Sequence, residues 1–413
     1  MTTSSRLVPL ALSLGGAVAL WHGVSGRVRV PFEYAATLRR WRIHFRNINP
    51  REGRDGTGRF TVRTVSLEVS AGGTNPAARP DPFDGDLTGS GRGVATAWQS
   101  TPIPAGVGHL LSYTWSSTEP PKRVVGGGWS AHGPDGEFEP TQHHPLDTWI
   151  EAEVDATTPV FAVLNDSIAS GVGAAVPVAD SWPSAYGRRV GALPMHYTAS
   201  GDTMKGWYDP NHVKWQRWKG LTHPDFAIHA MGLNDINLGT PIWELQARHL
   251  RTRAIIADLL TDKIYTGTIT PITRGDDSRL LTRRAYNAWL TCRDPEIIGF
   301  NRAVSADDRR LSPGFDTDGT HMNAAGYRRM SGEVPMAWAD AHRGLTIAAS
   351  GGTRHGHAIS PSPLSKEGRW GTHPPPPQGR PTVSTRQRDR RAHCAHSQRS
   401  LTFARPRTCR RVP

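Results

Sequence analysis

Cysteine is almost absent from this sequence. Cys292, Cys394 and Cys409 are the only three in 413 residues, so neither a disulfide framework nor a cysteine-based zinc site supports the fold. Long hydrophobic runs are missing as well. The stretch LVPLALSLGGAVALW, residues 7–21, is broken by proline and glycine and is too short to cross a bilayer. We therefore expect no transmembrane segment.

Acidic residues are fewer than basic ones, and the formal net charge is +13. Most of the excess of basic residues lies at one end of the chain. Residues 351–413 hold 13 Lys and Arg against 2 acidic residues, which leaves 36 against 34 in residues 1–350. Residues 346–413 contain few large apolar side chains, so burial cannot offset the entropy of ordering them. We predict a disordered basic tail there. Because a charge run alone is weak evidence of binding and no nucleic-acid-binding motif accompanies it, we expect no specific nucleic-acid partner.

Residues 1–26 allow two interpretations. Arg6 followed by a short apolar stretch is compatible with a signal peptide cleaved after VSG. The same residues can instead be the first strands of the fold, because RVRVPF continues directly with period-two alternation. Secreted and cytoplasmic locations therefore both stay open.

Residues 27–155 predict an all-β domain. Apolar residues alternate with polar ones in RVRV, WRIHFR, FTVRTVSLEV, HLLSYTW and WIEAEV, and turn-forming segments rich in glycine, proline and aspartate separate them. The apolar phase slips between Val62 and Val65, as it does at a β-bulge. We expect a β-sandwich or jelly-roll-like domain.

Residues 156–345 predict an α/β domain with a parallel sheet, because short apolar runs alternate with helical periodicity. The strands expected are PVFAVL, PMHYTA, DFAIHAMG, KIYTGTIT and EIIGF. The strongest helix covers residues 241–261, and another covers residues 323–342. Trp207, Trp215 and Trp218 can stack on sugar rings or pack in the core, and core packing is the expectation.

Ligands of open α/β sheets bind at the carboxyl ends of the strands, and polar residues follow four of these runs. Ser167 follows the first run, Gly201 the second and Asn234 the third. Asp318 and His321 lie in DTDGTHMNAAGY, before the last helix. Acyl transfer to a serine needs a nucleophile, a base, a group that orients the base and donors for the oxyanion.

These residues can fill all of those roles. Ser167 is the candidate nucleophile, His321 the base, and Asp318 the carboxylate that holds the required imidazole tautomer, with Asp316 as a minor rival. The backbone N–H groups of Ser167 and Gly201 and the side-chain amide of Asn234 are the candidate oxyanion donors. Taken alone, Ser167 would be interpreted as a turn or helix-cap serine, and it is the other three segments that favour a nucleophile.

No metal or organic cofactor is expected. The segment DTDG lacks the bidentate glutamate that would complete an EF-hand calcium loop. His143 and His144 have no third ligand at a spacing typical of a zinc site.

The segments NDSIASG, SGDTM, MGLNDI and DGTHMNAAGY resemble, in this order, the four blocks of the SGNH hydrolases, the GDSL-type esterases and lipases. The resemblance covers residues 158–343. It implies a three-layer α/β/α, flavodoxin-like catalytic domain, an acyl-serine intermediate and a small-molecule or carbohydrate ester as substrate. The preceding β-domain looks like that of two-domain members, many of which deacetylate carbohydrates.

The sequence departs from this family at one position of the first block. Asn165 stands where the family has glycine, and asparagine tolerates positive φ better than most residues. We expect the turn to survive with activity altered. The alternative is a catalytically impaired carbohydrate-binding protein on the same fold. Acyl and alcohol specificity and the oligomeric state stay open.

Overall fold

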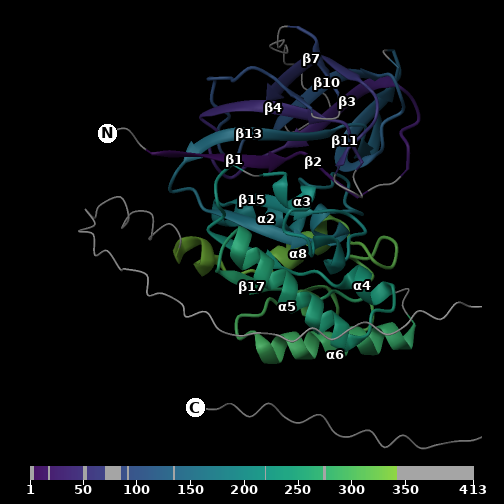
Figure 1. Ribbon diagram of the computed structural model, residues 1–413, viewed down its shortest axis with the longest axis vertical. Helices are drawn as coiled ribbons and strands as arrows, with labels where there is room; N and C mark the ends of the chain where they lie inside the picture. The colour runs from purple at the N-terminus through teal and green to yellow at the C-terminus, as the bar shows by residue number, and fades with distance from the viewer. Residues whose placement is uncertain are drawn as a thin grey trace, which may run out of the picture. The chain divides into compact units, whose positions relative to one another are not determined.

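The computed structural model describes residues 4–16, 19–49, 54–69, 85–90, 93–133, 135–218, 220–272 and 276–341. The basic tail predicted at residues 346–413 lies outside the described residues. Figure 1 shows the strands of the first 155 residues in purple and blue and the later α/β part in teal to yellow-green. No helix in the described ranges is long and apolar enough to cross a membrane.

The first part of the chain forms two antiparallel sheets. The alternation expected of a strand with one buried face is clearest in β4 (Arg40–Arg46). Its Trp41, Ile43 and Phe45 are buried, and the arginine and histidine residues between them are not. One sheet has the order β1 (Ser5–Ala11), β13 (Asp147–Asp155), β4 and β9 (Val94–Ala95). The other has the order β12 (Glu139–His144), β11 (Val124–His132), β3 (Ser25–Phe32), β10 (His109–Ser117), β7 (Phe60–Val69) and β8 (Leu87–Gly89), with β2 (Ser13–Leu14) paired to β11. The strands β5 (Ile48–Asn49) and β6 (Arg54–Asp55) pair only with each other. The predicted all-β architecture is confirmed.

The irregularity predicted in β7 is a bulge. Ser112 pairs with Ser66, but Thr114 pairs with Arg63, so two residues of β7 oppose one of β10. Thr64 adopts φ +49° at this point, and its hydroxyl lies 2.9 Å from that of Thr114.

The amino-terminal residues lie within the sheets. β1 pairs with β13 along its whole length, and its Val8 and Leu10 are buried. The sequence allowed residues 1–26 to be a signal peptide or the first strands of the fold. In the structure, Ser5–Ala11 and Ser13–Leu14 are strands.

The second part is built on a parallel sheet. Its strand order is β15 (Leu193–Thr198), β14 (Val160–Asn165), β16 (Phe226–His229) and β17 (Ile264–Thr266). Every residue of the first three is buried, as expected of a parallel sheet covered on both faces. The fifth predicted strand, EIIGF, is wrong as a strand: only Ile298 makes a parallel bridge, to Gly267, because helix α7 (Phe300–Val304) begins two residues later.

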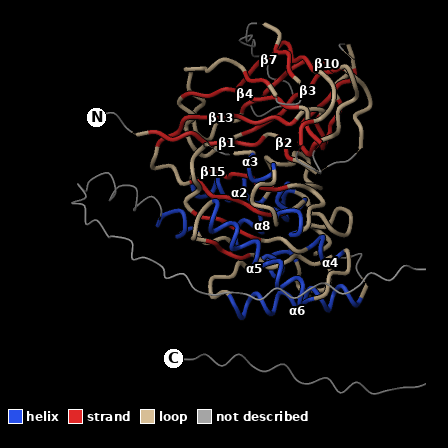
Figure 2. The backbone as a smooth tube through the Cα atoms, in the orientation of Figure 1, coloured by secondary structure: helices blue, strands red, loops and turns tan. Residues whose placement is uncertain are grey.

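The helices contact one another in two groups, which confirms the predicted three-layer domain (Figure 2). One group contains α2 (Trp182–Val190), α7 and α8 (Ala324–Glu333); the other contains α4 (Leu233–Asn237), α5 (Ile242–Leu259) and α6 (Asp277–Arg293). Short helices are α1 (Ser167–Ser170), the 3-10 turn η1 (Met204–Trp207) and α3 (Val213–Gln216). α8 ends earlier than predicted because Pro335 interrupts the helical hydrogen bonds before a further helical turn at residues 336–341. Trp207, Trp215 and Trp218 are buried in the core.

Candidate active site

Ser167 lies where the central strand turns into a helix. β14 ends at Asn165, and α1 begins at Ser167. Asp166 caps this helix, because its Oδ1 accepts the N–H of Ile168 at 3.0 Å. The turn places Ser167 at the carboxyl end of the sheet, where only 4% of the residue is exposed.

His321 and Asp318 reach this serine from the loop before α8. His321 Nε2 lies 2.9 Å from Ser167 Oγ, and His321 Nδ1 lies 2.8 Å from Asp318 Oδ2. Asp318 Oδ1 also accepts the N–H groups of Thr320 and His321, each at 2.9 Å. Burial alone would raise the pKa of Asp318, but these hydrogen bonds outweigh it and hold the pKa below its ordinary value. Asp316, the rival carboxylate, instead accepts the N–H of Gly319.

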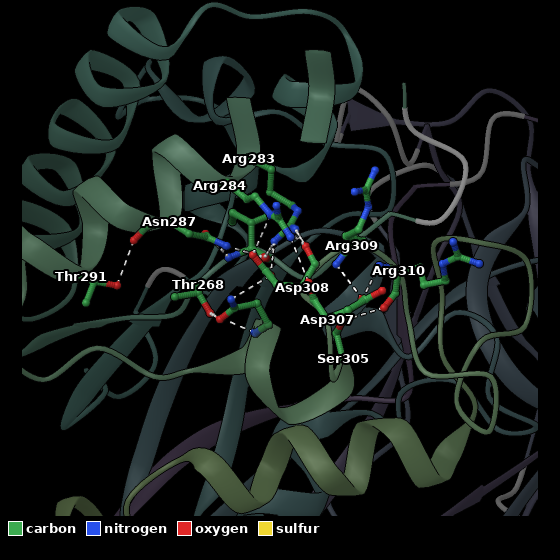
Figure 3. Close-up of polar contacts among 12 residues, drawn as sticks. Thr268, Arg283, Arg284, Asn287, Thr291, Ser305, Asp307, Asp308, Arg309 and Arg310 are labelled. Carbon is green, nitrogen blue, oxygen red and sulfur yellow. Dashed lines mark hydrogen bonds and ion pairs between the residues drawn. The ribbon is translucent and has the colours of Figure 1, made fainter. Parts of the chain in front are cut away.

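A polar network holds the chain that leads into this loop (Figure 3). Arg283 of α6 is 1% exposed and donates to Asp308 Oδ1 at 2.8 Å and to the carbonyl of Ile269 at 3.3 Å. Asn301 donates to the same carboxylate at 3.0 Å and accepts the hydroxyl of Thr268 at 2.7 Å. Asp308, at φ +52°, is thereby fixed between α6 and α7. This network was not predicted from the sequence, because the local pattern around Arg283 is that of a surface helix.

Two of the three candidate oxyanion donors have no acceptor in the described part of the protein. These are the backbone N–H groups of Ser167 and Gly201. Gly201 follows β15 with φ +81°, a conformation that favours glycine, and an added Cβ would meet no atom within 4 Å. Both N–H groups are therefore available to an incoming oxygen.

The third candidate donor, Asn234, is already engaged. Its Nδ2 donates to the carbonyl of Asp202 at 2.9 Å and to Asp166 Oδ2 at 3.2 Å. These bonds connect Asn234 to the residue before Ser167 and to the residue after Gly201. They also occupy both amide hydrogens, so an oxyanion must displace one of the two acceptors.

Buried carboxylates surround Asn234. Asp235 accepts the N–H of Met204 at 3.0 Å and pairs with Arg248 at 2.5 Å, and Asp202 pairs with Lys214. Burial raises the pKa of Asp166 to about 7; the Ile168 N–H opposes this rise, and the negative charges of Asp235 and Asp202 add to it. Asp166 and Asp235 were interpreted from the sequence as supporting or turn residues, and Asp202 was not singled out.

Asn165 does not form the turn expected of it. It is the last residue of β14, pairs with Thr198, and is not among the described non-glycine residues with positive φ. Its Oδ1 accepts the N–H of Asp166 at 2.7 Å, and the residue is 3% exposed. The strand pairing extends through this position, so the side chain needs no strained backbone.

Within the described ranges, no group of three or more His, Cys, Asp or Glu side chains is arranged to hold a metal ion.

Part of the chain matches a known protein family. Residues 166–329 match the model of the GDSL-like Lipase/Acylhydrolase family. No curated protein matches the chain. Among solved structures, the chain is similar to a member of the lipolytic protein G-D-S-L family from Veillonella parvula, with 19% identity over 43% of this chain and 95% of that one and a TM-score of 0.37.

Family two carbohydrate esterases are also similar. One from Clostridium thermocellum, in complex with cellohexaose, shows 12% identity over 78% of this chain and 94% of that one, with a TM-score of 0.38. One from Cellvibrio japonicus shows 11% identity over 81% and 99%, with a TM-score of 0.35. The match of residues 166–329 to the GDSL-like lipase and acylhydrolase family supports a hydrolase of ester bonds in this part of the chain.

Proposed function

We propose that this protein hydrolyses carboxylic esters through an acyl-serine intermediate on Ser167. The observation that carries the proposal is the continuous series of hydrogen bonds from Asp318 through His321 to Ser167. Asp318 fixes the tautomer in which His321 Nδ1 carries the proton, so Nε2 is free to accept the proton of the serine hydroxyl.

The reaction proceeds in two balanced halves. Ser167 Oγ attacks the ester carbonyl carbon while His321 Nε2 takes its proton, and the tetrahedral oxyanion is bound by the N–H groups of Ser167 and Gly201 and by Asn234. His321 then protonates the leaving alcohol, and the acyl group stays on Ser167. Water attacks this acyl-serine, again giving its proton to His321, and the carboxylic acid leaves with Ser167 restored.

The surroundings of His321 favour a short acyl group. An added Cβ on Gly173 would lie 2.6 Å from Thr317 Oγ1 and 3.1 Å from the Cβ of His321, so the two loops are in close contact there. Ser167 itself is almost buried. We therefore propose acetyl and other short acyl esters as substrates, including an acetylated carbohydrate.

Labelling with a fluorophosphonate probe, followed by peptide mass spectrometry, tests the proposal without knowledge of the substrate. The adduct is expected on Ser167 in the wild type and absent from Ser167→Ala. Ser170→Ala is the matched control, because Ser170 lies in the same helix but donates to the carbonyl of Asp166; it should label like the wild type. Label on Ser167→Ala, or no label on folded wild type, would overturn the proposal. Hydrolysis of acetyl and longer acyl esters of one alcohol then tests the acyl preference.

A further inference from the structure

The β part of the chain touches the loop that carries Gly201. Gly15 makes a parallel bridge to Ala199, and the N–H of Ser200 donates to the carbonyl of Gly15 at 3.0 Å. Gly16 adopts φ +135°, and an added Cβ there would lie 2.3 Å from both the backbone nitrogen and the Cβ of Ser200. The approach is close enough to require glycine at position 16.

The segment Ser13–Gly16, called the arm below, is firmly anchored on its other side. Ser13 is 0% exposed, and its Oγ accepts the N–H of Thr148 at 2.7 Å. Leu14 pairs with Val125 of β11. Arg217 of the α/β part donates to the carbonyl of Ser13 at 3.4 Å. The arm is thus held by the sheets of the β part before it reaches Ser200.

The loop that carries Gly201 is fixed at its other end as well. The carbonyl of Asp202 accepts the amide of Asn234 at 2.9 Å, and the carboxylate of Asp202 pairs with Lys214. Gly201 lies between this fixed residue and Ser200, which the arm holds. The N–H of Gly201 belongs to the peptide unit that joins Ser200 to Gly201, so a displacement of Ser200 redirects that donor.

We propose that the arm is a positioning element for catalysis: it holds Ser200 so that the N–H of Gly201 points at the oxyanion. The inference rests on the proposed function, because it presumes an oxyanion at this site. It gives the β part a role in the chemical step, carried by backbone atoms and not by a substrate contact.

Gly16→Ala tests the inference. Its added Cβ displaces Ser200, so kcat is expected to fall about tenfold or more with KM within threefold of wild type, because an oxyanion donor acts mainly in the transition state. The low-field proton resonance of the hydrogen bond between His321 and Asp318 should stay unchanged, which separates this effect from damage to the triad. Gly106→Ala is the control: Gly106 has φ +68°, but an added Cβ meets no atom within 4 Å, so its kcat should match wild type.

A folded Gly16→Ala protein with kcat within threefold of wild type would overturn the inference, as would a raised KM with unchanged kcat. Should Gly16→Ala not fold, Ser13→Ala takes its place, because it removes the anchor at Thr148 and keeps the backbone pairing of β2. Its kcat is expected to fall at least threefold at constant KM, and an unchanged kcat would count against the arm. Ser167→Ala separates the two proposals. If Ser167→Ala retains turnover, the proposed function fails. If Ser167→Ala loses turnover but Gly16→Ala has wild-type kinetics, only the role proposed for the arm fails.

Discussion

The side chain of Asn234 connects two segments of the fold and is also the proposed third oxyanion donor. In the free protein its amide joins the segment before Ser167 to the loop after Gly201. The bond to Asp166 is the longer of the two, at 3.2 Å, and is the one that an oxyanion can replace at lower cost. When the oxyanion forms, the amide of Asn234 would then donate to the oxyanion in place of the carboxylate of Asp166.

Asn234→Ala is therefore expected to lower kcat by about a hundredfold or more while the protein stays folded. The variant loses the proposed transition-state donor together with the bonds that hold Asp166 and Asp202. Steady-state kinetics with a short acyl ester measures the effect, and Asn237→Ala, in the same helix, is the control for loss of an amide. A decrease smaller than threefold would remove Asn234 from the mechanism.

The sequence places these polar residues well because they follow the strands. Ser167, Asn234, Asp318 and His321 each come just after an apolar run or just before a helix, so their meeting at one edge of the sheet was predictable. Arg283 was not, because its burial depends on Asp308, a residue 25 positions later in an irregular loop. No short-range sequence pattern indicates an ion pair between residues so far apart.

At the scale of elements, the short helix α1 carries an ionisable cap within the core. Asp166 is 0% exposed, and its pKa is raised from the ordinary 3.8 to about 7, chiefly by burial. Between these two values the folded protein keeps a proton that the unfolded chain has released. The free energy of unfolding contributed by this residue therefore falls as the pH rises from about 4 to 7, and it levels off above that.

Asp166→Asn should remove this dependence. Urea unfolding at pH 5 and pH 8 is expected to show that the wild type loses more free energy of unfolding between the two pH values than Asp166→Asn does. Asp258→Asn, an exposed residue of α5, is the control and should follow the wild type. Parallel behaviour of wild type and Asp166→Asn would contradict the raised pKa.

Helices and strands were predictable where the alternation of apolar and polar residues extends over many residues, and less so where the apolar run is short. The alternating strands and the bulge in β7 follow from their patterns. EIIGF has the apolar content of a strand, but α7 begins within it, and the backbone of Phe300 cannot be both strand and helix. The pairing of β1 with β13 joins segments too far apart for any local pattern to indicate.

At the scale of the whole molecule, a buried ion pair joins the β part to the α/β part. Arg217 lies 2.6 Å from Asp147, whose side chain is 1% exposed, and the guanidinium also lies over the ring of Trp218 at 4.3 Å. All described residues fall in one compact unit, residues 1–351. The two parts should therefore depend on each other for stability.

Arg217→Leu is expected to lower the free energy of unfolding by about 3–5 kcal/mol, because it leaves Asp147 buried without a countercharge. The double variant Arg217→Leu/Asp147→Leu should recover most of this loss, since no unpaired charge remains. Urea unfolding at pH 7 measures both. A single variant within about 0.5 kcal/mol of wild type would show that the pair contributes little.

The position of β1 also determines the order in which the protein can be completed during synthesis. Ser13 is synthesised 135 residues before Thr148, with which it forms a hydrogen bond, and Ser167 is synthesised 154 residues before His321. Contacts of this range are slow to form, and an unpaired apolar strand such as β1 is prone to aggregate meanwhile. His321, the proposed base, is synthesised after every strand of both antiparallel sheets, so the proposed site can form only once those strands have been made.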